Sequence, residues 1–180
     1  MKSLGDSELV SLTLNGELRA FEELVERYQK ILYNTVLKIV QDADDAHDIT
    51  QAGFVKAYEN LRSYKPQHKF FSWLYRIVIN ESLNALRSRK ETEAIDSRLM
   101  ASVKDPAELY EDTEREQYID KALQMLTPEN RAVVVLRHFQ DLSYNEISHI
   151  LDIPEKTVKS RLFTARQLLK DRLLKLGYSQ

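Results

Sequence analysis

Turn-forming residues are scarce in this chain, and their scarcity limits the fold more than any other feature. Only four Gly and four Pro occur among 180 residues, which leaves little material for the tight turns that join β-strands. The stretches between them are rich in Leu, Glu, Lys, Arg and Ala, which have high helix propensity. The sequence therefore predicts an all-α fold.

Apolar residues in the first half recur at helical spacing. Between positions 18 and 40 they follow every three or four residues: Leu18, Phe21, Val25, Tyr28, Leu32, Val36 and Ile39. This spacing predicts an amphipathic helix with one side in a core. We expect a short helix before it over residues 6–14, capped by Asp6, and a helix after it that Asp42 or Asp44 caps and that ends near residue 62. A loop around Pro66 precedes a helix over residues 70–90.

Capping signals divide the second half. Asp105 and Pro106 predict a helix start, Thr127 predicts a helix over residues 128–139, and Ser143 with Glu146 forms a capping box. Pro154 predicts a turn before a last helix over residues 155–176. The weak periodicity of residues 91–105 indicates a linker. We therefore expect two small helical domains, residues 1–90 and 116–180, joined by an acidic flexible linker at residues 91–115.

The net charge of −2 hides a strong segregation of charge. Residues 62–90 hold 7 basic and 1 acidic side chains, residues 155–180 hold 7 and 2, and residues 91–120 hold 3 and 10. Two cationic blocks thus flank an anionic segment, which is typical of two separate modules that bind nucleic acid. Solvated helix faces are the simpler interpretation of the same counts.

Several function classes are disfavoured by composition. The chain has no Cys, and its four His are scattered, so we expect neither a metal nor a cofactor. No nucleophile, base and orienting group occur together, and no phosphate-binding Gly loop exists, so we expect no enzyme and no small-molecule substrate. An apolar run of membrane-spanning length is missing, which predicts a cytoplasmic protein without direct membrane insertion.

Residues 142–169 read as a helix, a tight turn and a longer basic helix, the helix-turn-helix pattern. The second helix leaves polar and cationic side chains for the major groove. An αα-hairpin with a solvated basic side is the alternative. We call these residues of the second helix the recognition face: Lys156, Thr157, Lys159, Ser160, Arg161, Phe163, Thr164 and Arg166.

One side of the predicted helix at residues 70–90 combines an aromatic ring, two amides and two guanidinium groups. Its members follow at spacings of 3, 4, 4 and 3, and we call them the Trp73 face: Trp73, Arg76, Asn80, Asn84 and Arg87. Such a set suits unpaired bases, because the ring stacks, amides read base edges and Arg holds the backbone. The preceding loop offers the rim of a pocket for an extruded base: Tyr64, Lys65, His68 and Lys69. A core role for Trp73 is the alternative.

The helix before that loop carries an outward stripe that would repel phosphate, so a basic protein partner fits it better than DNA. We call it the acidic stripe: Asp44, Asp48, Gln51 and Val55. Ordinary solvated surface is the alternative.

Four stretches in this order resemble the extracytoplasmic-function (ECF) sigma factors of the sigma-70 family, the two-domain specificity subunits of bacterial RNA polymerase. They are "FEELVERYQ", "DAHDITQAGFVKAYENL", "FSWLYRIVINESLNALR" and "LTPENRAVVVLRHFQDLSYNEISHILDIPEKTVKSRLFTARQLL". The resemblance implies that residues 1–90 (sigma region 2) bind the clamp helices of the β′ subunit and melt the minus-ten element. It implies that residues 116–180 (sigma region 4) read the minus-thirty-five element and touch the β flap, and that an anti-sigma factor controls the protein.

The same resemblance assigns residues. Asp48, Gln51 and Phe54 match the clamp-binding stretch, while the Trp73 face and its loop match the melting surface. The chain departs from the family at three positions: Ala52 stands where Glu is common, Asp152 where the turn often has Gly, and Thr164 where Arg or His is frequent. A stand-alone helix-turn-helix regulator and a helical adaptor that binds only proteins remain as alternatives.

Overall fold

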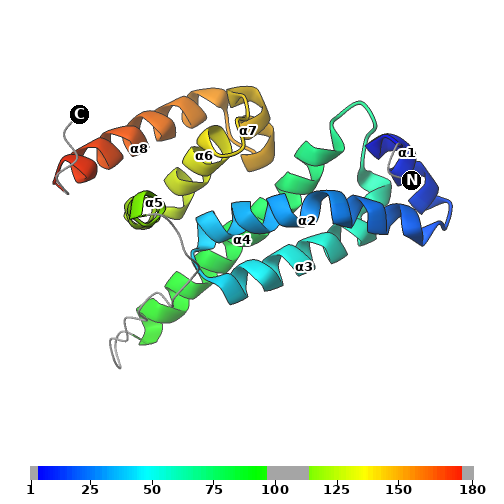
Figure 1. The fold of residues 1–180 in the computed structure, drawn as a ribbon, viewed down its shortest axis with the longest axis horizontal. Coiled ribbons are helices and arrows are strands. Elements are labelled where there is room, and N and C mark those ends of the chain that lie inside the picture. Colours follow the sequence, from blue (N-terminus) through cyan, green and yellow to red (C-terminus); the bar gives the residue numbers. More distant parts are fainter. Residues whose placement is uncertain (1–3, 97–113, 176–180) are drawn as a thin grey trace.

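The structure is a computed structural model that describes residues 4–96 and 114–175. Every regular element in these ranges is a helix (Figure 1), which confirms the all-α prediction. The first range holds α1 (Asp6–Leu14), α2 (Leu18–Val40), α3 (Ala43–Glu59), the 3-10 helix η1 (Leu61–Ser63) and α4 (Phe70–Asp96). The second range holds α5 (Glu114–Gln124), α6 (Pro128–His138), α7 (Tyr144–Leu151) and α8 (Glu155–Lys175).

Helices α2, α3 and α4 pack on one another and form the N-terminal core. The small residues on the inner side of α3, Ala46, Gly53 and Ala57, are buried there. At Gly53 the two helices α3 and α4 approach so closely that a Cβ atom would lie 2.6 Å from Cγ2 of Val78. The missing side chain of Gly53 therefore lets α3 lie directly against α4.

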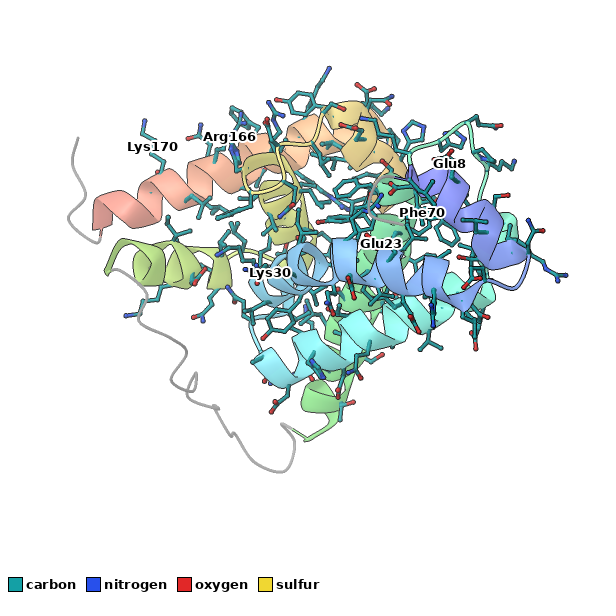
Figure 2. All side chains as sticks on the ribbon, turned by 45° about the vertical axis from the view of Figure 1, so that its right-hand side comes forward. Glu8, Glu23, Lys30, Phe70, Arg166 and Lys170 are labelled. Carbon is teal, nitrogen blue, oxygen red and sulfur yellow. The ribbon has the colours of Figure 1, made fainter. Side chains whose placement is uncertain are left out.

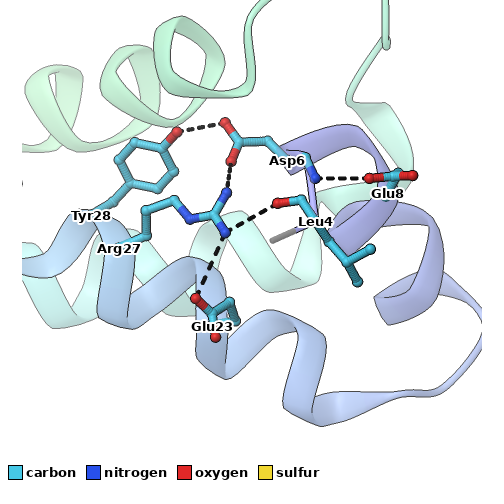
Figure 3. A network of polar contacts seen from close by, with 7 residues as sticks. Leu4, Asp6, Glu8, Glu23, Arg27 and Tyr28 are labelled. Carbon is cyan, nitrogen blue, oxygen red and sulfur yellow. Dashed lines mark hydrogen bonds and ion pairs between the residues drawn. The ribbon is translucent and has the colours of Figure 1, made fainter. Parts of the chain in front are cut away.

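A polar cluster fastens α1 to α2 (Figure 3). The Arg27 guanidinium donates to the Asp6 carboxylate at 2.7 Å, and the Tyr28 hydroxyl donates to the same carboxylate. Gly5 is the N-cap of α1, and its N–H donates to the Glu8 carboxylate at 2.8 Å. The expectation that Asp6 caps this helix was wrong, because its carboxylate turns toward α2 instead.

Local capping in the rest of the chain follows the sequence. Asp42 caps α3 by accepting from the N–H of Asp45, and Thr127 caps α6. Ser143 and Glu146 form the expected capping box at the start of α7, and Pro154 lies in the turn before α8. These bonds join groups three residues apart, which is why the sequence predicts them.

The long helix α4 continues to Asp96 instead of ending near residue 90. Of the rest of the expected linker, residues 97–113, including the cap predicted at Asp105 and Pro106, lie outside the described residues, and residues 114 and 115 begin α5. In the described ranges no helix has the length and apolar character needed to span a bilayer.

The C-terminal helices lie along α2 and α4, with α6 against α2 and α7 against α4 (Figure 1). Arg131 of α6 is at the centre of this junction and only 7% exposed. Its guanidinium donates to the carbonyl oxygens of Ile39 at 2.6 Å, Leu123 at 2.9 Å and Leu126 at 3.1 Å. One buried side chain therefore joins the end of α2 to the turn between α5 and α6.

A second buried contact lies on the α4 side of the junction. The Tyr75 hydroxyl is hydrogen bonded to the Thr35 hydroxyl at 3.1 Å and donates to Oε1 of Gln140 at 3.3 Å. Burial raises the pKa of Tyr75 to about 12. The group therefore stays neutral and keeps its proton for these bonds.

Candidate nucleic-acid and polymerase surfaces

The Trp73 face lies along one side of α4, because that segment is helical throughout. Arg76, Asn84 and Arg87 are exposed, while Trp73 and Asn80 are half-buried. A half-buried Trp has one part of its ring fixed by the core and another part available for stacking. Partial burial of Trp73 is compatible with both interpretations that the sequence left open.

The loop before α4 is held by its aromatic residues. Tyr64 is 7% exposed, and its hydroxyl donates to the carbonyl of His68 at 2.7 Å. Its ring lies 5.5 Å from the ring of Phe70 and 5.7 Å from that of Trp73. The buried Tyr64 side chain thus connects the loop to the core. The other residues predicted for the rim of the pocket, Lys65, His68 and Lys69, are exposed.

Carboxylates of the C-terminal helices meet the cations of this region. Nζ of Lys69 lies 2.9 Å from Glu146, Arg76 lies 3.1 Å from Asp152, and Arg87 lies 3.7 Å from Glu129. Between α4 and α7 remains a pocket of about 520 Å³ whose wall includes the Trp73 side chain. Neither these pairs nor the pocket followed from the sequence, since the paired residues are far apart along the chain.

Glu146 is the most strongly perturbed acid of the site. The N–H of Ser143, the ammonium of Lys69 and the Ser143 hydroxyl lower the pKa of its carboxyl to about 2. All three groups favour the charged form. One carboxylate therefore both completes the capping box of α7 and pairs with a loop cation.

The acidic stripe is on the outer side of α3. Asp44, Asp48, Gln51 and Val55 are exposed, and Val55 keeps 57% of its surface in solvent. Phe54 is only 8% exposed and is part of the core. The stripe is thus an acidic surface with one apolar residue. Phe54 does not belong to this surface, and its side chain packs in the core on the inner side of α3.

The recognition face lies on the outer side of α8. Six of its residues are exposed: Lys156, Lys159, Ser160, Phe163, Thr164 and Arg166. Thr157 and Arg161 are half-buried. Phe163 keeps 66% of its surface in solvent and so presents an apolar ring among these polar side chains. Lys170, one turn further along α8, also projects outward (Figure 2).

Geometry at the turn between α7 and α8 explains how the recognition face is presented. Asp152 adopts the left-handed conformation with φ 55° and ends α7. The buried side chains Ile147, Val158 and Leu162 then close the small core between the two helices. On the α6 side, burial and the charges of Arg166 and Arg137 lower the pKa of His138.

Sequence reasoning missed the residues that join the two halves. Asp152 was considered only as a turn residue, and neither Glu129 nor Arg131 was singled out. A buried Arg without a carboxylate partner has no sequence signature, because its acceptors are backbone carbonyls. Among residues 4–96 and 114–175, no cluster of His, Asp and Glu is arranged to hold a metal ion.

Comparison with known proteins gives the family. Residues 24–92 match the family described as sigma-70 region 2, and residues 116–169 match sigma-70, region 4. The "RNA polymerase sigma-H factor" of Pseudomonas aeruginosa is 32% identical over 176 residues, which is 91% of each chain. The "ECF RNA polymerase sigma-E factor" of Escherichia coli is 32% identical over 184 residues, 96% of each chain.

Two solved structures share the fold at 26% identity and a TM-score of 0.70. One is CnrH in complex with the cytosolic domain of CnrY, matched over 93% of this chain and 96% of that one. The other is the sigma factor RpoE of Bartonella quintana with the anti-sigma factor NepR, matched over 88% and 98%. The chain therefore belongs to the sigma-70 family, as an ECF sigma factor that directs transcription initiation by RNA polymerase.

Proposed function

We propose that the three surfaces divide the work of promoter opening. The acidic stripe of α3 docks on the β′ clamp helices, the Trp73 face captures unpaired minus-ten bases, and the recognition face reads the minus-thirty-five duplex. The observation that carries this assignment is the pair of separate cationic surfaces on α4 and α8, together with an acidic surface on α3, which precedes both in the chain.

The mechanism is non-catalytic in this proposal. Binding to core polymerase positions both DNA-reading surfaces. Unstacking a base costs roughly a few kcal/mol, and capture of the extruded base by the Trp73 face offsets this cost. Residues 1–90 form the first functional unit, residues 91–115 the acidic connection, and residues 116–180 the second unit. The protein acts where the polymerase is, in the cytoplasm.

Control by an anti-sigma factor is part of the same proposal. The two solved structures most useful for comparison hold CnrY and NepR, respectively. A protein of that kind is expected to bind this chain as well and to hold it inactive.

The assignment of the Trp73 face is tested by promoter opening. The double variant Trp73→Ala with Asn80→Ala should bind core polymerase normally and form no open complexes, measured by permanganate reactivity of promoter thymines. As the matched control, Asp48→Ala with Val55→Ala removes side chains of the acidic stripe and should weaken polymerase binding instead. Unchanged thymine reactivity in the Trp73 and Asn80 variant would reject the role of this face.

Salt dependence tests the assignment of the recognition face. Lys159→Ala and Arg166→Ala should each weaken minus-thirty-five binding and lower the salt slope by roughly one per lost phosphate contact. The matched control is Lys170→Ala, also exposed on α8 but outside the recognition face. A slope that stays the same in both variants contradicts phosphate roles for these residues.

A further inference from the structure

Aromatic rings in contact connect helix α2 to the Trp73 side chain. The Tyr28 ring of α2 lies 5.9 Å from the Phe70 ring at the start of α4 and 6.0 Å from the neighbouring Phe71 ring. Phe70 in turn lies 5.6 Å from Trp73 and 5.5 Å from Tyr64. These distances between ring centroids are in the range of favourable aromatic contacts. Tyr28 is therefore linked to Trp73 through one shared neighbour, Phe70.

The Phe70 ring has little freedom to move by itself. It is 2% exposed, and three other rings contact it, those of Tyr28, Tyr64 and Trp73. The rings of Tyr64 and Trp73 also lie 5.7 Å from each other. Because a packed interior leaves little free volume, a shift of one ring displaces its neighbours. The position of the Tyr28 ring therefore affects where the Trp73 ring lies and how the loop at residues 64–69 is held.

The polar end of the Tyr28 side chain is fixed by α1 (Figure 3). Its hydroxyl donates to one oxygen of the Asp6 carboxylate, and the Arg27 guanidinium donates to the other oxygen at 2.7 Å. Burial and the Asp6 carboxylate raise the pKa of Tyr28, so the hydroxyl keeps its proton for this bond. A hydrogen bond to a charged acceptor is stronger than one between neutral groups. The Tyr28 ring is thus held by α1 at its hydroxyl and by α4 at its ring.

We propose that Tyr28 is a positioning residue for promoter opening. Its ring, fixed by Asp6, supports Phe70 and so holds Trp73 and the loop before α4 in the arrangement that receives an extruded base. Tyr28 acts through Phe70 and does not touch the DNA. A stacking ring that is already fixed loses less conformational freedom when a base binds, so it binds the base more tightly. The inference rests on the proposed function of the Trp73 face.

Arg27 allows this positioning role to be separated from simple attachment of α1. Its guanidinium pairs with Asp6 and with Glu23, and it donates to the carbonyl of Leu4 at 3.2 Å. Arg27 and Tyr28 both join α1 to α2, and Tyr28 also contacts the rings of α4. If these side chains only hold α1 in place, loss of either has the same effect on promoter opening. In the positioning role, loss of Tyr28 has the larger effect.

The test measures promoter opening by holoenzyme assembled with the full chain, as permanganate reactivity of promoter thymines. Tyr28→Leu removes two ring contacts, each worth about two- to tenfold in an equilibrium, so opening should fall about fivefold or more. Arg27→Met is the matched control and should open the promoter nearly as well as the wild type. Tyr28→Phe keeps the ring and should restore most of the opening. The proposal is overturned if Arg27→Met or Tyr28→Phe loses as much opening as Tyr28→Leu.

Fluorescence gives a second measurement, which is specific to the Trp73 side chain. The chain contains a single Trp, so the intrinsic Trp emission of the free protein comes from this residue alone. In Tyr28→Leu the emission should move to longer wavelength and acrylamide should quench it more strongly, since the ring is less tightly packed. In Arg27→Met both properties should match the wild type. Far-UV circular dichroism selects a temperature at which both variants are fully helical, and unchanged emission in Tyr28→Leu there contradicts the link through Phe70.

A third variant, Trp73→Ala, separates this inference from the proposed function. If Trp73→Ala abolishes opening and Tyr28→Leu leaves it unchanged, the proposed function stands and the positioning role of Tyr28 is rejected. If Trp73→Ala itself leaves opening unchanged, the Trp73 face does not capture bases, and the inference is rejected with it. The affinities of Tyr28→Leu for core polymerase and for the minus-thirty-five duplex should equal those of the wild type. Loss of either affinity would place the effect of Tyr28 outside the Trp73 face and would also reject the positioning role.

Discussion

Gly53 offers the sharpest test of how α3 is held against α4. In Gly53→Ala the added Cβ would lie 2.6 Å from Cγ2 of Val78, 3.4 Å from its Cβ and 3.6 Å from its Cα. Carbon atoms in contact prefer about 3.5 to 4.0 Å, so the nearest methyl must move by roughly 1 Å. Overpacking of this kind costs about 1 to 3 kcal/mol. Against this stands a gain of about 1 kcal/mol in helix propensity.

The net expectation for Gly53→Ala is a destabilisation of about 0 to 2 kcal/mol, measured as the free energy of unfolding in urea by far-UV circular dichroism. The propensity contribution is measured separately with Ala52→Gly, at the exposed neighbouring position of the same helix. In a Val78→Ala background the clashing methyl is absent, so Gly53→Ala should become stabilising by about 1 kcal/mol.

The double-mutant cycle therefore predicts a coupling energy of about 1 to 3 kcal/mol between positions 53 and 78, as expected for residues in direct contact. Two results together would refute this reasoning. The first is that Gly53→Ala stabilises the protein by as much as Ala52→Gly destabilises it. The second is that the change in unfolding free energy caused by Gly53→Ala is the same with Val and with Ala at position 78. In that event α3 and α4 are not in close contact at this point.

Two further predictions concern the C-terminal helices. The lowered pKa of Glu146 means that its charged form stabilises the fold above the unfolded pKa of about 4.3 and that this contribution is lost as pH falls toward about 2. The difference in urea midpoint between the wild type and Glu146→Gln should therefore shrink as pH falls from 5 to 2, with roughly half of the effect of the charge lost by pH 3. A constant difference would show that the charge contributes nothing. Arg131→Met leaves the carbonyls of Ile39, Leu123 and Leu126 without their donor and should lower the free energy of unfolding by about 2 to 5 kcal/mol. A loss below about 1 kcal/mol would mean that water replaces the guanidinium at no cost.

Helix positions and helix faces were predictable because their causes are local. A helix links residues three and four apart, so the apolar spacing from Leu18 to Ile39 indicates α2 before any tertiary contact is known. The capping box at Ser143 and the cap at Thr127 are equally local. The shared side of Trp73, Arg76 and the two Asn on α4 follows from the same periodicity.

Burial of individual side chains was less predictable. Tyr64 and Phe54 were expected in binding surfaces, and their roles there stay predictions, but both side chains lie mainly in the core. Asp6 was expected as a cap and instead pairs with Arg27, 21 residues away. In each case the decisive contact comes from another helix, which the spacing along one helix does not report.

What the sequence by itself determined is where most helices begin and end and which of their sides carry positive or negative charge. Only the tertiary structure decided that Lys69 meets Glu146, 77 residues along the chain, and that Arg76 meets Asp152. The physical reason is the range of the interactions. Helical hydrogen bonds and caps act within four residues, whereas the pairing of two charged sides depends on how whole helices pack, and hence on the buried contacts of Arg131 and Tyr75.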